Sequence, residues 1–495
     1  MLRLILIAIG LALHWSAMAQ KPNIVFIFAD DMSYKTAGFM GHKTVKTPNL
    51  DALAESGIIF DRAYNMGAWT GAVCISSRTM LNAGKTVWRA RDIDKLFANT
   101  KKTKALSSEA KESLELERNH VSESFWASRM RKAGYDTYLS GKWHIKAPAT
   151  KSFEEIGTVR PGMPNQADIR YQRTFDEHND NWSPFDKSFG GFWQGGKHWS
   201  EAQADEAIAY LDSKSSSDKP FFMYLSFNAP HDPRQAPKEF VDLYPIDNIA
   251  LPESFVAKNE HMLTMGLLFP DNPNKKITRD ENLGPLPRTE YSTKVNRQEY
   301  YAAISHMDEQ IGRVINHLEE NNLLHNTVII FTADHGLAIG EHGLLGKQNL
   351  FEHSMRAPFF IAGKDIPKGE RRQQRIYLQD AMATSLDIAE ADESGVEFKS
   401  LLPAIEENEN VYPHVYGAYL DTQRAIIKDN FKLILYPQGS IVQLYDLQQD
   451  PDELDDLAQL ESSKSIIKEL FQLLLEEQKR QNDRLDLVAV FPEFN

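Results

Sequence analysis

Apolar stretches alternate along the chain with amphipathic ones, and several of the apolar stretches end in polar residues. Residues 24–28, 221–227 and 327–331 are mostly apolar runs, which are typical of strands buried on both faces of a parallel sheet. Residues 296–321 repeat apolar positions at a helical period and predict a long amphipathic helix. This alternation predicts a doubly wound α/β sheet.

Capping residues and glycine stops predict further elements between these runs. They are helices over residues 48–56 and 124–133, and strands over residues 58–64 and 136–139. The first helix follows Thr47 with Pro48 at its first position, and Gly57 ends it. The elements therefore continue the α/β alternation between the three apolar runs.

Polar clusters directly follow four of the predicted strands. They are Asp30-Asp31, Gly141-Lys142-Trp143-His144, Asn228-Ala229-Pro230-His231 and Asp334-His335. Ligands of doubly wound sheets bind beyond the carboxyl ends of the strands, so we expect these clusters to share one rim. Singly, each cluster is more typical of a turn, a helix cap or a structural histidine. Together they indicate a site for a hard divalent cation, for which Ca²⁺ is a better candidate than Mg²⁺ in an exported protein.

The expectation of export comes from residues 1–19. A short positive start, an apolar run over residues 4–15 and Ala17-Met18-Ala19 are typical of a secretory signal cleaved after Ala19. A buried N-terminal strand is the alternative. The run is shorter than a membrane span, and no other stretch approaches the ~20 apolar residues that a span requires. We therefore expect the mature protein to reach a periplasm or the cell exterior.

Composition narrows the classes of protein. The chain has 495 residues, of which 42% are hydrophobic and 25% charged, and these values exclude low-complexity and disordered classes. A formal net charge of -14 argues against a nucleic-acid partner, because phosphate binding needs clustered Lys and Arg. The length predicts a large domain over residues 20–365 and a smaller one over residues 366–495.

The chain has a single cysteine, Cys74, which excludes an intramolecular disulfide. The segment Cys74-Ile75-Ser76-Ser77-Arg78 precedes a helical stretch that ends at Gly84. Cys74 is then expected at a helix N-terminus beside Arg78, where the helix dipole and the guanidinium both favour an anion. An inert buried thiol is the alternative.

The segment from Cys74 to Arg78, with Gly84 six residues further on, resembles the signature of the type I, formylglycine-dependent sulfatases, usually written C-x-P-S-R or C-x-A-S-R. Residues 22–31, 141–144, 229–231 and 332–336 resemble further blocks of that family in the same order. The resemblance runs from Lys21 to about Asp446. It implies an alkaline-phosphatase-like fold, in which a doubly wound mixed sheet is flanked by helices. It also implies a C-terminal subdomain, with an antiparallel sheet over residues 415–420, 424–428, 431–436 and 441–446 and a helix over residues 462–479.

The resemblance also implies a nucleophile and a metal site. A maturation enzyme, the formylglycine-generating enzyme, would oxidise Cys74 to formylglycine (3-oxoalanine), whose hydrate attacks sulfur and later expels sulfate. Ca²⁺ would be held by Asp30, Asp31, Asp334 and His335, together with the modified Cys74.

Five further residues take catalytic roles by the same resemblance. Lys142 and Lys347 neutralise charge on the sulfate, and Arg78 orients the hydrate. His231 is the acid that protonates the leaving alcohol, and His144 is the base that deprotonates the second hydroxyl.

One residue of the signature departs from the family. Ser76 stands where the family has Pro or Ala, and its small size leads us to expect that maturation proceeds. Sulfate ester hydrolysis is therefore the leading function. Hydrolysis of a phosphonate monoester or phosphodiester is the second candidate function. A non-catalytic protein that binds sulfated glycans is the third, and it applies if Cys74 is not matured.

The substrate is expected to contact two long segments, residues 146–200 and 228–294, because such stretches in compact domains are usually functional or mobile. The candidate binding residues are Trp193, Lys197, His198 and Arg234. An aromatic and basic cluster suits stacking on a sugar and contact with an anion, so we expect a sulfated carbohydrate, such as a polysaccharide fragment. The alternative is that the tryptophans anchor the core and that Arg234 pairs with a nearby acid.

Overall fold

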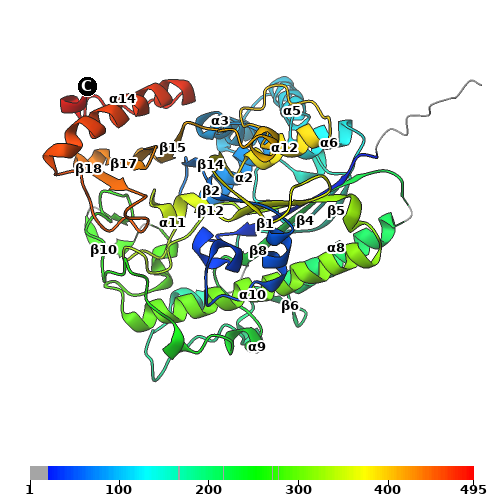
Figure 1. Cartoon of the computed structure of the whole chain (residues 1–495), viewed down its shortest axis with the longest axis horizontal. Coiled ribbons are helices and arrows are strands. Elements are labelled where there is room, and N and C mark those ends of the chain that lie inside the picture. The colour runs from blue at the N-terminus through cyan, green and yellow to red at the C-terminus, as the bar shows by residue number, and fades with distance from the viewer. Residues whose placement is uncertain (1–19, 165–167, 216, 270, 277) are drawn as a thin grey trace, which may run out of the picture.

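The computed structural model describes residues 20–164, 168–215, 217–269, 271–276 and 278–495. A nine-stranded mixed sheet crosses the middle of the molecule (Figure 1). Its strand order is β12 (Arg356–Ala357), β2 (Gly57–Tyr64), β13 (Phe359–Gly363), β11 (Thr327–Ala333), β1 (Asn23–Asp30), β8 (Phe221–Pro230), β4 (Asp136–Lys142) and β5 (Glu155–Arg160), and β14 (Glu370–Tyr377) pairs with β2. This sheet confirms the predicted α/β fold.

The centre of the sheet is parallel from β11 through β1, β8 and β4 to β5. Its inner strands β11, β1 and β8 are mostly apolar, and all residues of these three strands are buried, as expected for a sheet covered on both faces. On the other side, β13 runs antiparallel to both β11 and β2. The predicted strands therefore exist, and the sheet is mixed.

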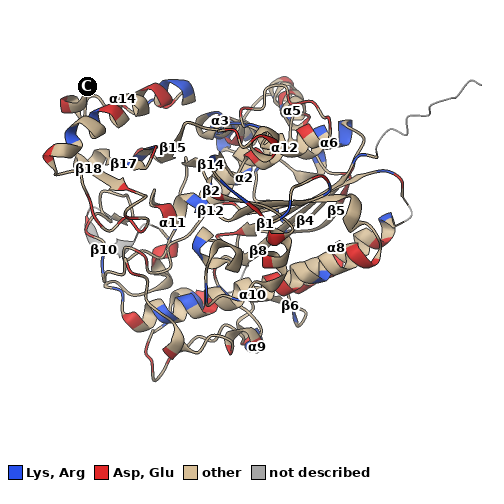
Figure 2. Cartoon of the chain, in the orientation of Figure 1, with Lys and Arg blue, Asp and Glu red and all other residues tan. Residues whose placement is uncertain are grey.

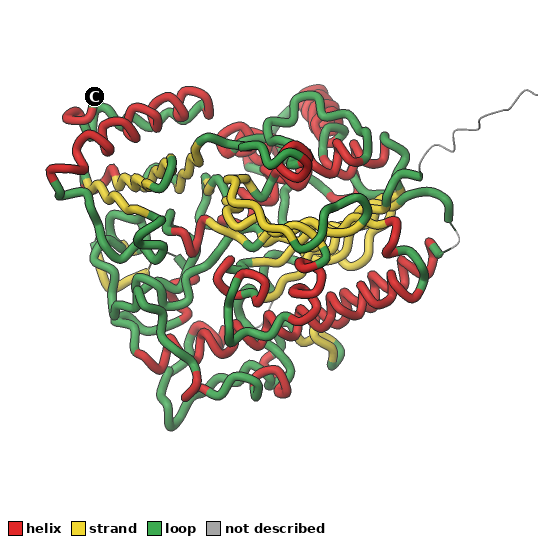
Figure 3. The backbone as a smooth tube through the Cα atoms, viewed as in Figure 1, coloured by secondary structure: helices red, strands yellow, loops and turns green. Residues whose placement is uncertain are grey.

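Helices cover both faces of this sheet, which lies between them as the yellow layer of Figure 3. On one face lie α8 (Trp199–Lys214) and α10 (Glu290–Glu320), which pack against each other and against β8. On the other face lie α2 (Val73–Ala83), α3 (Val87–Leu96), α5 (Ser108–Ser122), α6 (Trp126–Lys132) and α12 (Asp380–Ile388).

The long helix α10 begins at residue 290, not at residue 296 as predicted. The side chain of Thr289 accepts a hydrogen bond from the backbone N–H of Ser292, and the Ser292 hydroxyl accepts one from the backbone N–H of Thr289. This capping box satisfies two of the free N–H groups at the helix start, so the helix extends beyond its amphipathic pattern.

A second, five-stranded sheet forms the C-terminal subdomain, at the upper left of Figure 1. Its order is β18 (Ile441–Asp446), β17 (Phe431–Tyr436), β16 (Gln423–Lys428), β15 (His414–Tyr419) and β3 (Gly67–Ala68), and α14 (Lys464–Gln481) packs on β16. The predicted antiparallel sheet and helix are therefore present. The short strand β3 comes from the N-terminal part of the chain and pairs with β15, which joins the two sheets.

The domain boundary predicted after residue 365 stays a prediction. Both β14 and α12 follow that residue and pack with the elements of the large sheet. The predicted export signal, residues 1–19, lies outside the described residues. Among the helices that are described, none is long and apolar enough to cross a membrane. Figure 2 shows basic and acidic residues interspersed along α10 and α14.

A buried ionic network connects the two sheets. Lys432 on β17 is fully buried, and its Nζ lies 3.1 Å from Glu352 Oε1 and 2.7 Å from Glu453 Oε1. Glu352 begins α11 (Glu352–Met355), and its Oε2 accepts a hydrogen bond from the Tyr64 hydroxyl on β2. Burial raises the pKa of Glu453 to about 7, although Lys432 opposes this shift.

We expect Lys432→Met to lower the free energy of unfolding by about 3–5 kcal/mol, because it leaves the buried Glu453 without its cation and Glu352 with Arg356 alone. The matched control is Lys428→Met, which removes an exposed lysine paired with Glu469 and should cost about 1 kcal/mol or less. Urea unfolding followed by circular dichroism measures both variants. Equal losses in the two variants would show that the buried network does not stabilise the fold.

Candidate functional site

The carboxyl ends of four parallel strands bring the polar clusters to one rim. The register pairs Ala29 of β1 with Ala333 of β11, and Asp30 with Pro230 of β8. Asp30, Asp334 and His231 therefore lie at the same level, as the strand-end pattern predicts. A cavity of about 420 Å³ opens there, and its lining includes Cys74, His144, His231 and Lys347.

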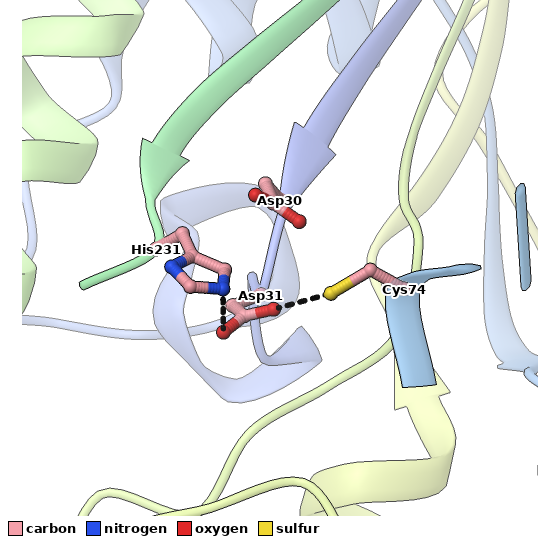
Figure 4. A group of neighbouring side chains, drawn as sticks. All are labelled: Asp30, Asp31, Cys74 and His231. Carbon is pink, nitrogen blue, oxygen red and sulfur yellow. Dashed lines mark hydrogen bonds and ion pairs between the residues drawn. The ribbon is translucent and has the colours of Figure 1, made fainter. Parts of the chain in front are cut away.

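Cys74 is the second residue of α2 and is almost fully buried, with 2% of its surface exposed. Its Sγ lies 3.6 Å from Asp31 Oδ1 (Figure 4). It also lies 3.3 Å from His335 Nε2 and 3.2 Å from Lys347 Nζ. Burial raises the pKa of the thiol well above its usual value, although Lys142 and Lys347 oppose this shift. The unmodified thiol is therefore a poor nucleophile in this site.

Arg78 lies one helical turn after Cys74 and is fully buried. Its Nε donates to Asp334 Oδ2 at 3.0 Å, and Nη2 contacts Asp30 Oδ1 at 3.4 Å. Its Nη1 donates to Ser226 Oγ at 2.6 Å and to the carbonyl oxygen of Lys142 at 2.9 Å. The guanidinium thus binds the carboxylates beneath the cavity instead of lining it, and it positions them.

Asp31, Cys74, Asp334 and His335 form a group whose ligand atoms all lie within 4.8 Å of one another. The Nδ1 of His335 donates to the Gly336 carbonyl oxygen at 2.8 Å, which leaves the Nε2 lone pair facing Asp31 Oδ1 at 3.2 Å. An imidazole fixed in this way is typical of a metal ligand. Carboxylate oxygens with one imidazole suit a hard divalent cation, so the residues fit the predicted metal.

Asp30 belongs to a second, overlapping group with Asp31, Cys74 and His231 (Figure 4). Burial raises the pKa of Asp31 to about 6, and the like charges of Asp30 and Asp334 add to this effect. Such crowding of buried carboxylates requires compensating positive charge.

Two buried lysines supply part of this charge. Lys142, at the end of β4, pairs with Asp30 Oδ2. Lys347 Nζ donates to Asp31 Oδ1 at 2.7 Å and to Asp31 Oδ2 at 2.8 Å, and it also reaches the cavity. The structure therefore brings both predicted lysines to the rim.

His231 and His144 both line the cavity. The Nδ1 of His231 donates to the Asp232 carbonyl oxygen at 2.8 Å, and Nε2 faces Asp31 and Lys347 (Figure 4). His144 packs against Gly162, where an added Cβ would lie 2.7 Å from its Cδ2. Burial, together with Lys142 and Arg78, lowers the pKa of His144 to about 2. Its Nδ1 is buried and has no hydrogen-bond partner among the described residues.

The four predicted substrate-binding residues do not line this cavity. Arg234 is buried, donates from Nη1 to Asn296 Oδ1 at 2.8 Å and stacks on a tyrosine ring. His198 is buried and caps α8, and Lys197 pairs with Asp205 at 2.6 Å. Trp193 packs against His198, and Lys187 lies over its ring. The substrate role of these four residues stays a prediction. Arg234 bonds the amide of Asn296 and not the acid that the structural alternative expects, and the Lys197 side chain is 54% exposed.

The sequence analysis missed several residues that line the cavity, among them Arg279, Asp280 and Gln348. Arg279 Nη2 lies 3.4 Å from His231 Nε2, and Asp280 accepts a hydrogen bond from Gln348 Nε2. No apolar run or helical period marks residues 278–281 in the sequence, and the strand before them, β10 (Asn272–Lys276), is short and polar, so only the tertiary structure reveals their place.

Comparisons with known proteins agree with this site. The family model described as Sulfatase matches residues 22–391, and the model described as N-sulphoglucosamine sulphohydrolase, C-terminal, matches residues 340–481. An arylsulfatase of Clostridium perfringens is 28% identical over 493 residues, covering 92% of this chain and 94% of the relative. A mouse iduronate 2-sulfatase is 26% identical over 485 residues, covering 90% of this chain and 78% of the relative.

Solved structures share the fold. One was determined in complex with its substrate D-glucosamine-2-N,6-O-disulfate; it has a TM-score of 0.68 at 22% identity and covers 94% of this chain and 99% of its own. A phosphonate monoester hydrolase of Agrobacterium radiobacter has a TM-score of 0.69 at 20% identity, and the match covers 93% of this chain and 96% of the hydrolase.

We expect the protein to bind a divalent cation, and His335→Ala to weaken this binding at least about tenfold, because the variant removes one ligand of the set. Titration calorimetry with CaCl₂ and with MgCl₂ measures the affinity without any turnover. The matched control is His306→Ala, which removes a histidine that is equally buried but belongs to neither ligand group. Equal affinities in both variants would contradict a metal role for His335.

Proposed function

The chain belongs to the sulfatase family and is a sulfuric ester hydrolase, and we propose that its substrate is a sulfated carbohydrate. The observation that carries this proposal is the position of Cys74, buried at the rim between His335 Nε2 at 3.3 Å and Lys347 Nζ at 3.2 Å. Relatives named N-acetylglucosamine-6-O-sulfatase and ulvan-active sulfatase support a glycan substrate. The proposal includes export by residues 1–19.

The proposed chemistry needs two groups that the chain itself does not encode. We propose that Cys74 is oxidised to formylglycine and that Ca²⁺ is bound by Asp30, Asp31, Asp334, His335 and the modified residue. When bound, these groups supply the nucleophile for sulfur and a Lewis acid for one sulfate oxygen.

The lysines hold the sulfate in this proposal. Lys142 Nζ is fixed by Asp30 at the end of β1, and Lys347 Nζ is fixed by Asp31, the residue after that strand. Preorganised ammonium groups in a dry site stabilise charge that develops in the transition state. Arg78 does not touch the substrate; it keeps Asp30 and Asp334 in place.

The two histidines move protons. His231 presents Nε2 to the cavity because its Nδ1 donates to the Asp232 carbonyl oxygen, so the imidazolium form of His231 would give the Nε2 proton to the leaving alcohol. His144 is assigned the proton of the second hydroxyl, and its Nδ1 has no hydrogen-bond partner among the described residues. Each imidazole is thus assigned one proton transfer.

The first test is the mass of the tryptic peptide that contains Cys74, from protein made with and without a formylglycine-generating enzyme. We expect a loss of about 18 Da with the enzyme, as CH₂SH becomes CHO. Ser76→Ala restores the family signature and serves as the control, which should convert at least as completely. An unmodified thiol in both preparations would favour the alternative function, a non-catalytic protein that binds sulfated glycans.

A second test uses the packing of His144. We expect Gly162→Ala to lower kcat on 4-nitrophenyl sulfate by about 10- to 100-fold, because the new methyl displaces the imidazole. Gly157→Ala is the matched control: its Cβ would lie 2.7 Å from the Tyr138 hydroxyl, a similar crowding outside the cavity. A comparable loss of kcat in the control would reject the role of His144.

The alternative, hydrolysis of phosphonate monoesters or phosphodiesters, is kept because the fold matches such an enzyme with a TM-score of 0.69. Rates on 4-nitrophenyl sulfate and on 4-nitrophenyl phenylphosphonate separate the two. We expect the higher kcat/KM on the sulfate.

A further inference from the structure

The mouth of the cavity is built from an arginine and an aspartate that the proposed chemistry does not use. Arg279 and Asp280 both line the cavity, on the loop that precedes α10. The Arg279 side chain is 40% exposed, whereas that of Asp280 is 4% exposed. Asp280 is held in place, since its Oδ2 accepts a hydrogen bond from Gln348 Nε2.

Among the described residues, the hydrogen bonds that Arg279 donates all come from one nitrogen atom. Its Nη2 lies 3.3 Å from Asp280 Oδ1, 3.4 Å from Asp232 Oδ1 and 3.4 Å from His231 Nε2. Its Nε and Nη1 have no hydrogen-bond partner among the described residues. These N–H groups are therefore free to donate to a ligand, and they lie beside the histidine assigned to the leaving alcohol.

The carboxylates around Arg279 disfavour a second anionic group on the ligand. Ligand oxygens of Asp31, Asp232 and Asp280 lie within 4.8 Å of one another. A carboxylate or second sulfate bound to Arg279 would also face Asp280, and like charges at this range repel. A hydroxyl group suffers no such penalty, because it can donate to an aspartate and accept from an arginine.

The cavity also has a less polar part. Its lining includes Met163, together with Tyr419 at the end of β15 and Leu420 after it. A cavity that offers both apolar surface and a donor–acceptor pair matches a sugar ring, which has apolar C–H faces and polar edges.

From this arrangement, we propose that Arg279 and Asp280 together bind hydroxyl groups of a neutral sugar beside the sulfate ester, so that the enzyme selects monosulfated neutral sugars over uronates and over sugars with a second sulfate nearby. Asp280 accepts from one hydroxyl, and Arg279 Nε or Nη1 donates to its neighbour. This inference rests on the proposed function, because the sulfate must lie between Lys142 and Lys347 for the sugar to reach this pair.

Binding is measured first, with a variant that cannot turn over. In Cys74→Ala, titration calorimetry compares the 2-, 3-, 4- and 6-sulfates of D-galactose with D-galactose 2,6-disulfate and with 2-sulfated glucuronic acid. We expect at least one galactose monosulfate to bind about tenfold more tightly than both of the doubly charged sugars. Equal or tighter binding of the doubly charged sugars would overturn the inference.

Variants in matured protein then assign the selectivity to the pair. Arg279→Ala should lower kcat/KM on the best monosulfate at least about tenfold more than on 4-nitrophenyl sulfate, which has no sugar hydroxyls. Asp280→Asn should raise turnover of D-galactose 2,6-disulfate relative to that monosulfate, because it removes the repelling charge. The matched control is Arg313→Ala: that arginine is 39% exposed, pairs with Asp205 and lies outside the cavity.

If Arg279→Ala lowered kcat/KM equally on the best monosulfate and on 4-nitrophenyl sulfate, the inference would be overturned. Unchanged selectivity between the monosulfate and the disulfate in Asp280→Asn would overturn it as well. Failure of the proposed function has a different signature. Protein with verified formylglycine would then hydrolyse neither 4-nitrophenyl sulfate nor any sulfated sugar, while the binding comparison in Cys74→Ala would still decide the preference for neutral sugars.

Discussion

The site depends on one buried guanidinium that connects the ends of four parallel strands. Arg78 contacts Asp30 at the end of β1, Ser226 on β8, the carbonyl oxygen of Lys142 at the end of β4 and Asp334 after β11. Burying these carboxylates without a cation would be strongly unfavourable, because an unpaired charge inside a protein costs several kcal/mol. The same contacts align the strand ends, so the charge that permits burial also sets the geometry of the rim.

This constraint explains why so much of the site could be predicted from sequence. Its acidic and basic residues directly follow strands whose apolar character is strong, and parallel strands place their ends at one edge. Asp30, Asp334, His231 and Lys142 therefore come together in the structure as expected. The position of Cys74 at the start of α2 was likewise predictable, because Gly84, in a left-handed conformation with φ 62°, ends that helix.

The residues around the substrate were harder to predict, because their positions depend on loops with no repeating pattern. Arg234 follows His231 closely in sequence, yet its guanidinium turns inward to Asn296 on α10. Arg279 is remote from His231 in sequence, and it is the arginine that reaches the cavity. Sequence proximity to a strand end therefore predicts the catalytic rim, but it does not predict which side chains of a following loop return to it. The early start of α10 has a similar cause, since a local cap at Thr289 overrides the amphipathic period.

The C-terminal subdomain is part of the site through its contacts as well as its fold. On β16, Gln423 donates from Nε2 to the carbonyl oxygens of Gln348 and Met265, at 2.9 and 3.0 Å. These bonds hold the segments that carry Lys347 and Gly266 against the cavity, while β15 supplies Tyr419. The strand ends of the large sheet therefore carry Asp30, Lys142, His231 and Asp334, whereas the second sheet contributes Tyr419 to the wall of the cavity. Because the two sets of residues are carried by different sheets, the shape of the pocket for the sugar can vary while the strand ends around Arg78 stay the same.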